Sequence, residues 1–138
     1  MKRFNITYCL LLLVAQLSIT IKVDATHVMG ADITYVCLDN NQYEITLTIY
    51  RDCAGNDLSE SHFINFASAS CNEDFNILFQ LDSAKDVSPV CPTTTTTCNG
   101  GLIPGTEAWW YSEIVTLPAS CSDWTISWED CCRNDNIT

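Results

Sequence analysis

Basic residues are scarce in this chain. Of its 138 residues, 6 are Lys or Arg and 17 are Asp or Glu, which gives a formal net charge of −11. A surface with this balance repels phosphate backbones and anionic headgroups, which argues against nucleic acid and acidic membranes as partners. With 47% hydrophobic residues the chain still has enough apolar surface for a core, and its length suits one domain.

The sequence also lacks the short motifs that mark common active sites and zinc sites. It has no Gly-x-Ser-x-Gly elbow, no His-Glu-x-x-His helix and no Cys-x-x-Cys pair, and His27 and His62 are not at zinc-ligand spacing. We therefore expect a protein that is not an enzyme, without a cofactor and without catalytic residues.

No apolar run is long enough to span a membrane. Lys2 and Arg3 precede an apolar stretch at residues 9–15, polar side chains interrupt residues 16–22, and Val23-Asp24-Ala25 offers small residues for cleavage. This pattern predicts a secretory signal peptide at residues 1–25 and a mature domain at residues 26–138. Removing the signal leaves 113 residues and a formal charge of −13. We expect a secreted or cell-surface protein.

Eight cysteines remain after the signal, an even number that predicts disulfides in an oxidising compartment. The candidates are Cys37, Cys53, Cys71, Cys91, Cys98, Cys121, Cys131 and Cys132.

Geometry limits how these cysteines pair. A hairpin turning near Asn40 places Cys37 and Cys53 on the order of 30 Å apart, beyond the roughly 7 Å that a disulfide allows. Cys91 and Cys98 flank a short loop and can close it. The neighbours Cys131 and Cys132 point to opposite faces of a strand and should not pair. With a Cys91–Cys98 bridge, ten connectivities stay open for the other six cysteines.

The mature chain alternates like β-strands separated by turns. Residues 43–50 place apolar side chains on one face, and residues 28–38 precede them across the turn residues 39–41. Further alternating runs lie at residues 75–81, 110–116 and 124–128, with a weaker run around Ile64 and Phe66. Six short strands in a chain of this size predict an all-β, antiparallel, immunoglobulin-like β-sandwich with disulfides in preference to a barrel. The Thr-rich loop at residues 91–101 should lie at the surface.

Aromatic residues give the strongest sign of a binding face. Trp109, Trp110 and Tyr111 are consecutive, so on a strand at least one must face away from the core. Trp124 and Trp128 share one face of their run; a sugar-stacking platform is one interpretation, and an inward core position is the one we favour.

Charged residues offer two weaker hypotheses. Arg51 and Arg133 each lie beside an acid or amide near a cysteine, and an ion pair with Asp52 would fix a strand end; solvated surface charges are the alternative. Acidic residues in loops also suit an extracellular calcium site, although none matches the twelve-residue calcium loop. The weak calcium candidates are Asp52, Asp57, Glu129 and Asp130.

Several segments in order resemble one protein family. They are Ala25 to Tyr35, Tyr43 to Cys53, Leu117-Pro118 and Trp124 to Asn134, of which Arg-Asp-Cys at 51–53 and Cys-Cys-Arg-Asn at 131–134 are the most specific. This order resembles the N-terminal domain of large gliding-motility-associated surface proteins of Bacteroidota-type bacteria, which are exported by the type IX secretion system.

The resemblance implies a non-enzymatic cell-surface or adhesion module that precedes further domains of the same polypeptide. In that family the chain continues well past the segment Cys-Cys-Arg-Asn, so we expect a fragment truncated at its C-terminus, with an open sheet edge if a closing strand lies downstream. The alternative function is an extracellular carbohydrate-binding module that uses the aromatic face of Trp109, Trp110 and Tyr111. The partners expected are therefore the downstream domains and an extracellular glycan or protein.

Overall fold

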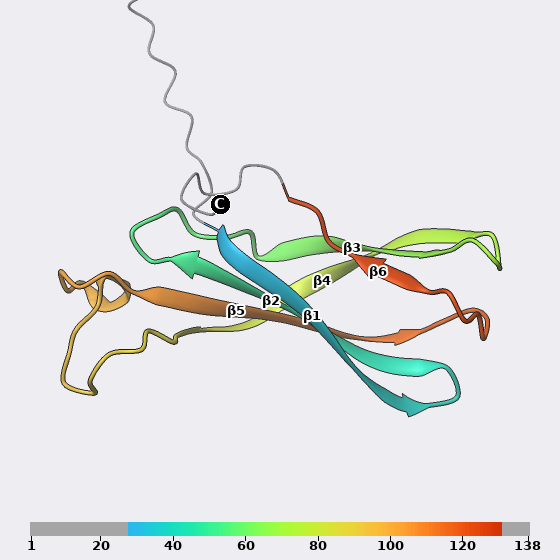
Figure 1. The fold of residues 1–138 in the computed structure, drawn as a ribbon, viewed down its shortest axis with the longest axis horizontal. Helices are drawn as coiled ribbons and strands as arrows, with labels where there is room; N and C mark the ends of the chain where they lie inside the picture. Colours follow the sequence, from blue (N-terminus) through green and yellow to red (C-terminus); the bar gives the residue numbers. More distant parts are fainter. Residues whose placement is uncertain (1–27, 131–138) are drawn as a thin grey trace, which may run out of the picture.

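A computed structural model describes residues 28–130, which form one antiparallel sheet of six strands in the order β1-β2-β5-β4-β3-β6 (Figure 1). The strands are β1 (Val28–Asp39), β2 (Gln42–Asp52), β3 (Ser61–Ser68), β4 (Glu73–Asp86), β5 (Thr106–Thr116) and β6 (Thr125–Ser127), with a short 3-10 helix, η1 (Thr97–Asn99), between β4 and β5. The predicted signal peptide at 1–25, Cys131, Cys132 and Arg133 lie outside the described residues.

Strand β4 is shared by both layers of the sheet and joins them. Its first half, Glu73 to Gln80, pairs with β3, whereas its second half, from Leu81 onward, pairs with β5. The register shifts between Leu81 and Ser83, at the point where β4 leaves one partner for the other. In Figure 1, β4 passes from the layer of β3 and β6 to the layer of β1, β2 and β5. The sheet is thereby nearly barrel-shaped, with β1 and β6 as its two edge strands.

The β1–β2 hairpin has the predicted register from Cys37, which lies opposite Tyr43, to Gly30, which lies opposite Tyr50. Irregularities shift the register at both ends, so Val28 lies opposite Arg51, one residue away from the predicted position. At the turn, Asn40 and Asn41 have φ values of 46° and 62°, a left-handed conformation that asparagine tolerates better than most residues. The Asp39 carboxylate accepts a hydrogen bond from the Asn40 backbone N–H. The turn sequence therefore sets the register of both strands.

The core lies between the two layers and uses the predicted alternation. Three inward side chains of β2, Ile45, Leu47 and Ile49, are fully buried and meet side chains from β3, β4 and β5 in one cluster. Burial of each such side chain stabilises the fold by roughly 1.5–3 kcal/mol. The fully buried apolar side chains are Ile45, Leu47, Ile49, Ile64, Phe66, Phe79, Ala108 and Tyr111.

Two details differ from the prediction. The run at residues 124–128 forms a strand only at Thr125–Ser127, because β3 pairs with it at three positions alone. The Thr-rich loop does not lie wholly at the surface: Thr96 is buried, and its hydroxyl donates to Asp86 Oδ2 at 2.6 Å. A polar threonine is accommodated there because the Asp86 carboxylate satisfies its hydroxyl.

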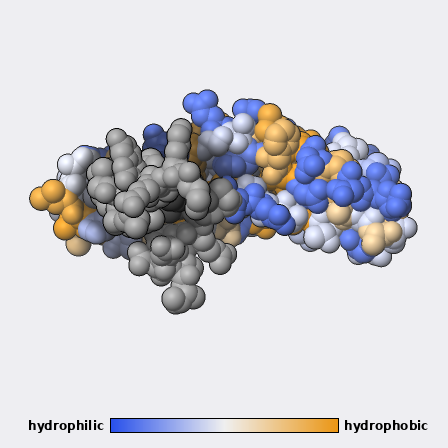
Figure 2. Space-filling view, turned by 90° about the horizontal axis from the view of Figure 1, so that it is seen from above, coloured by the Kyte–Doolittle hydropathy of each residue, from blue (hydrophilic) through white to orange (hydrophobic). Residues whose placement is uncertain are grey.

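The all-β, antiparallel and disulfide-bonded parts of the prediction are confirmed, while the immunoglobulin-like sandwich stays a prediction. Seen from the side of β3 and β6, the visible coloured surface is mostly hydrophilic, with smaller hydrophobic patches between (Figure 2). No helix within residues 28–130 has the length and apolar character that crossing a membrane requires.

Candidate functional site

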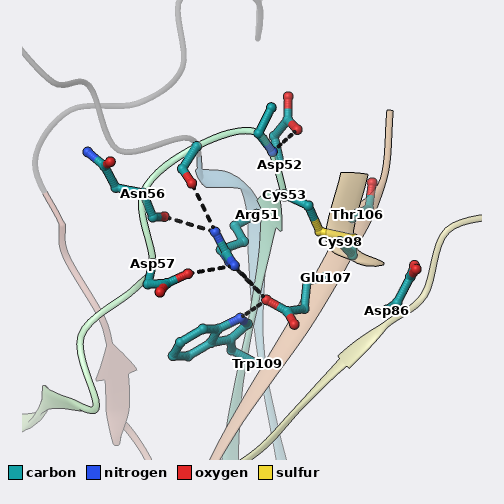
Figure 3. A network of polar contacts seen from close by, with 12 residues as sticks. Arg51, Asp52, Cys53, Asn56, Asp57, Asp86, Cys98, Thr106, Glu107 and Trp109 are labelled. Atoms are coloured by element: carbon teal, nitrogen blue, oxygen red, sulfur yellow. Dashed lines mark hydrogen bonds and ion pairs between the residues drawn. A yellow bond between two sulfur atoms is a disulfide. The ribbon is translucent and has the colours of Figure 1, made fainter. Parts of the chain in front are cut away.

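A buried arginine ties the end of β2 to β5. The Arg51 side chain is 9% exposed; its Nε donates to Glu107 Oε2 at 2.9 Å, and its Nη2 lies 2.8 Å from Asp57 Oδ1. Trp109 Nε1 donates to the same Glu107 oxygen, and its ring centroid is 5.5 Å from the guanidinium carbon (Figure 3). Since Asp57 is exposed and Glu107 is not, the Arg51–Glu107 pair contributes more to stability than the Arg51–Asp57 pair.

Asp52, the acid expected to pair with one of Arg51 and Arg133, does not pair with Arg51, and Arg133 lies outside the described residues. Asp52 follows Arg51 in the strand, so its side chain points to the other face and accepts a hydrogen bond from the Ala54 backbone N–H instead (Figure 3). Arg51 Nη1 donates to the carbonyls of Gly55 and Asn56, which adds the following loop to the network. An ion pair at this strand end is confirmed for Arg51, with acids other than the one expected.

The predicted Cys91–Cys98 bridge was also wrong. Cys98 pairs with Cys53 just after β2, and Cys91 is a free, exposed cysteine. The loop folds back on the sheet, where the Thr97 N–H donates to the Ile103 carbonyl, and this brings Cys98 to a Cα–Cα distance of 4.8 Å from Cys53. The sequence showed a closable loop but not the tertiary contact that turns it toward β2.

A second bridge joins the opposite end of the molecule. Cys71, in the turn between β3 and β4, pairs with Cys121 before β6, and their Cα atoms are 6.3 Å apart. Beside it the Asp123 carboxylate accepts hydrogen bonds from the hydroxyls of Ser68 and Ser70, which lower its pKa to about 2. Cys37 is free and exposed, and the predicted absence of a Cys37–Cys53 bridge is confirmed.

The three consecutive aromatics are divided between two faces of β5. Trp109 and Tyr111 are buried, and the Tyr111 hydroxyl donates to the Ser59 carbonyl at 2.8 Å, while burial raises the Tyr111 pKa to about 12. Trp110 is half-buried on the outer face, opposite Thr48 of β2. A glycan platform at this position therefore depends on Trp110 rather than on all three residues.

An open groove separates the two edge strands. Trp124, Ile126 and Trp128, from β6 and the residues around it, are half-buried against the core, as we favoured for the two tryptophans. Between them and the β1–β2 hairpin lie two hollows. One has a volume of about 210 Å³ and is lined mainly by Tyr35, Tyr43, Ile45, Leu117, Trp124 and Ile126. The other has a volume of about 110 Å³ and is lined by Ala31, Asp32, Ile33, Leu47 and Trp128.

His62 lies beside the end of this groove. Its ring packs edge-on against Tyr111 and Trp128, with centroid distances of 4.9 and 5.4 Å. Its Nε2 is buried and has no hydrogen-bond partner among the described residues. Burial lowers the pKa of His62, and the nearby Asp130 partly opposes that shift. The ring is therefore held neutral and acts as an apolar support for Trp128.

The four calcium candidates do not lie together as one set. Asp57, Glu129 and Asp130 line a hollow of about 420 Å³ beside His62, but Asp57 is paired with Arg51, and Asp52 belongs to the turn after β2. Within residues 28–130 no group of three or more His, Cys, Asp or Glu side chains is arranged to hold a metal ion. The hollow is acidic, but it is not built as a calcium cage.

The described part of the chain thus combines two clamped ends with an open, apolar-lined groove. Sequence reasoning missed the Glu107–Trp109 contacts, the Asp123–serine cluster and the groove, because each depends on which distant strands become neighbours. No family model, curated protein or solved structure matches this chain.

Proposed function

We propose that this protein is an exported, non-enzymatic cell-surface module of adhesion type, built as an immunoglobulin-like β-sandwich. One observation carries the proposal: an all-β, antiparallel sheet of six strands is clamped by disulfides at both ends. Disulfides persist in oxidising compartments outside the cytoplasm, which agrees with a cleaved signal at residues 1–25.

The strand order supports the immunoglobulin-like assignment. If the six strands are lettered A to F in chain order, β1-β2-β5-β4 reads A-B-E-D and β3-β6 reads C-F. Immunoglobulin constant-type domains have the sheets A-B-E-D and C-F-G. Under this proposal residues 28–130 supply strands A to F, and the position beside β6 that strand G would take is without a strand in this part of the chain.

Expression in a bacterium tests export directly. The chain carrying its own residues 1–25 should appear outside the cytoplasm, begin at Thr26, and give Cys53–Cys98 and Cys71–Cys121 peptides under non-reducing conditions. Beads coated with the purified, oxidised chain should then attach to host or bacterial surfaces more than beads coated with the reduced, unfolded chain. An uncleaved, reduced protein that stays in the cytoplasm would refute the proposal.

A carbohydrate-binding function has one observation in its favour. Trp110 is partly exposed on the outer face of the sheet, and the register places Tyr50 at the diagonal position to it, within reach of a shared planar ligand. On a glycan array, binding should disappear with Trp110→Ala and persist with Ile114→Ala, an exposed control on the same face of β5. Equal loss in both variants would exclude a site at Trp110.

A further inference from the structure

We propose that the groove between β1 and β6 accepts one extended segment of a partner polypeptide, apolar at alternate positions and basic at the positions between. The segment adds a strand to the edge of β6 that has no strand partner within residues 28–130, and it lies beside β1. This inference concerns the purified chain and does not depend on where the protein is located in the cell.

The two free edges define the direction of the added strand. Along β1 the chain passes from the smaller hollow, at Ile33, to the larger one, at Tyr35. From β6 to the residue that follows it, the chain passes from the larger hollow, at Ile126, to the smaller one, at Trp128. β1 and β6 therefore run in opposite directions across the groove. A segment antiparallel to β6 would be parallel to β1, and its backbone would satisfy edge N–H and C=O groups that β3 does not reach.

The hollows match side chains at alternate positions of a strand. Ile33 and Tyr35 are two residues apart on β1, so the hollows beside them follow the two-residue period with which strand side chains return to one face. An apolar cavity of about 150 Å³ accepts a benzene ring. A volume of about 210 Å³ therefore suits a large apolar side chain, and about 110 Å³ suits a smaller one.

The walls of the groove are apolar groups that the described chain leaves without full cover. Tyr35 is 67% exposed although its side chain faces the core side of the hairpin, where its ring meets Tyr43 edge-on at 6.1 Å. Ile33, Trp124, Ile126 and Trp128 are each half-buried. An inserted strand would complete their burial, which is the main source of affinity in strand addition together with the backbone hydrogen bonds.

The acidic residues around the groove favour a segment that carries positive charge. Residues 28–130 contain 15 Asp and Glu against two cations, Arg51 and Lys85, and Arg51 is already paired with Glu107 and Asp57. Asp32 lines the smaller hollow, and Glu129 and Asp130 directly follow Trp128. Lys or Arg on the outward side of the segment would be attracted there, whereas a second copy of this acidic chain would be repelled.

The residues of the chain after the described part do not fit the groove by sequence. Residues 131–138 read Cys-Cys-Arg-Asn-Asp-Asn-Ile-Thr and include one large apolar side chain, Ile137. They lack the alternation that two successive hollows require. Residues 131–138 therefore do not supply this segment, and the spacing of the hollows together with the acidic surroundings favours a basic, alternating segment of a partner polypeptide.

A synthetic peptide tests this proposal. The probe is a fluorescent peptide of about eight residues, within the usual range of strand lengths, in which Val or Ile alternates with Lys or Thr. The purified, oxidised chain should bind it saturably, and added salt should weaken binding. A scrambled peptide of the same composition, and one with Glu in place of Lys, should each bind at least about tenfold more weakly, since alternation and positive charge are both required.

Two exposed residues provide matched variants. Tyr35→Ser removes a groove wall and should weaken peptide binding about tenfold or more, as expected for a central aromatic contact. Ile114→Ser alters an outer-face residue of similar exposure, 62%, and should leave binding unchanged. Circular dichroism checks that both variants stay folded.

Thiol labelling locates the bound peptide on the folded chain. Cys37 follows Tyr35 by two residues on the same face of β1, whereas the free Cys91 lies in the loop after β4. Peptide should slow alkylation of Cys37 and leave Cys91 reactive, as read by mass spectrometry of the two tryptic fragments. Four outcomes would each overturn the proposal. The scrambled peptide could bind as tightly as the alternating one, or Tyr35→Ser could bind the peptide as tightly as the native chain. The chain could also form a dimer that closes the groove, or Cys37 could resist alkylation without peptide.

Discussion

Strands β1 and β2 are paired along nearly their whole length and carry similar alternating patterns, yet they are buried very differently. On β2, Ile45, Leu47 and Ile49 have no exposed surface. On β1, Ile33 faces Leu47 and is half-exposed, and Tyr35 faces Ile45 and is 67% exposed. The core cluster places Ile64 and Phe66 of β3 and Phe79 of β4 against β2.

The difference teaches that alternation alone does not bury a strand face. A row of apolar side chains becomes core only where a second layer covers it, and the layer of β3, β4 and β6 ends before it reaches β1. The exposed inner row of β1 is therefore the part of the described fold that one further strand would complete.

The largest expected loss of stability comes from opening a disulfide. Neither bridge includes β1, so this loss concerns the parts of the sheet other than β1. Replacing Cys71 and Cys121 by Ser opens a bridge between residues 50 apart in sequence and should lower the free energy of unfolding by about 4 kcal/mol. Urea denaturation of the oxidised protein measures the change. Cys37→Ser is the matched control on β1 and should be nearly neutral; a comparable loss there would mean that β1 carries as much of the stability as the clamped layers.

The next effect compares one residue type on the two strands. Ile45→Ala on β2 leaves a cavity in the core and should cost about 2–5 kcal/mol of unfolding free energy. Ile33→Ala on β1 removes a half-exposed side chain and should cost less than about half as much. Chemical denaturation of both variants gives the two values, and equal losses would contradict the difference in cover.

The end of β1 at Val28 is buried, and Arg51 of β2 lies opposite Val28. Substitution of Arg51 therefore tests the stability of the one end of β1 that is covered. Arg51→Met keeps the length of the side chain but leaves the Glu107 carboxylate, which is 19% exposed, without its cation, and it should cost about 2–3 kcal/mol. Thermal denaturation measures the loss. Asp57→Asn removes only the exposed partner and should cost less than about 1 kcal/mol; an unchanged melting temperature in Arg51→Met would remove the proposed anchor.

The smallest effect concerns pH at the groove. Burial lowers the pKa of His62 in the folded chain below its ordinary value of 6.5. As pH falls, the unfolded chain therefore binds the proton before the folded chain does. The stability that neutral His62 provides is present above pH 6.5 and is lost as pH falls below that value. Melting temperatures of the native chain and of His62→Phe should therefore converge or cross as pH falls from 7 to 5. Parallel curves for the two proteins would show that His62 does not support Trp128 in its neutral form.

The sequence was sufficient for features that depend on neighbouring residues. Strand alternation, the β1–β2 register with Cys37 opposite Tyr43, and the inward row of β2 follow from side-chain periodicity and the Asp-Asn-Asn turn. Features that depend on distant strands were missed or assigned wrongly. Cys98 bonds Cys53 rather than Cys91, and Arg51 meets Glu107 rather than Asp52, because β5 and its preceding loop lie beside β2 in space and not in sequence.

Amide hydrogen exchange of β1 and β6 tests the central claim most directly. In the oxidised chain alone, outward-facing amides at these two edges should exchange fast while β2 amides exchange at the rate set by global unfolding. The alternating basic peptide should slow exchange at both β1 and β6 and nowhere else. Edges already as protected as β2 in the free chain, or protection by the peptide at other strands, would contradict a strand-accepting groove.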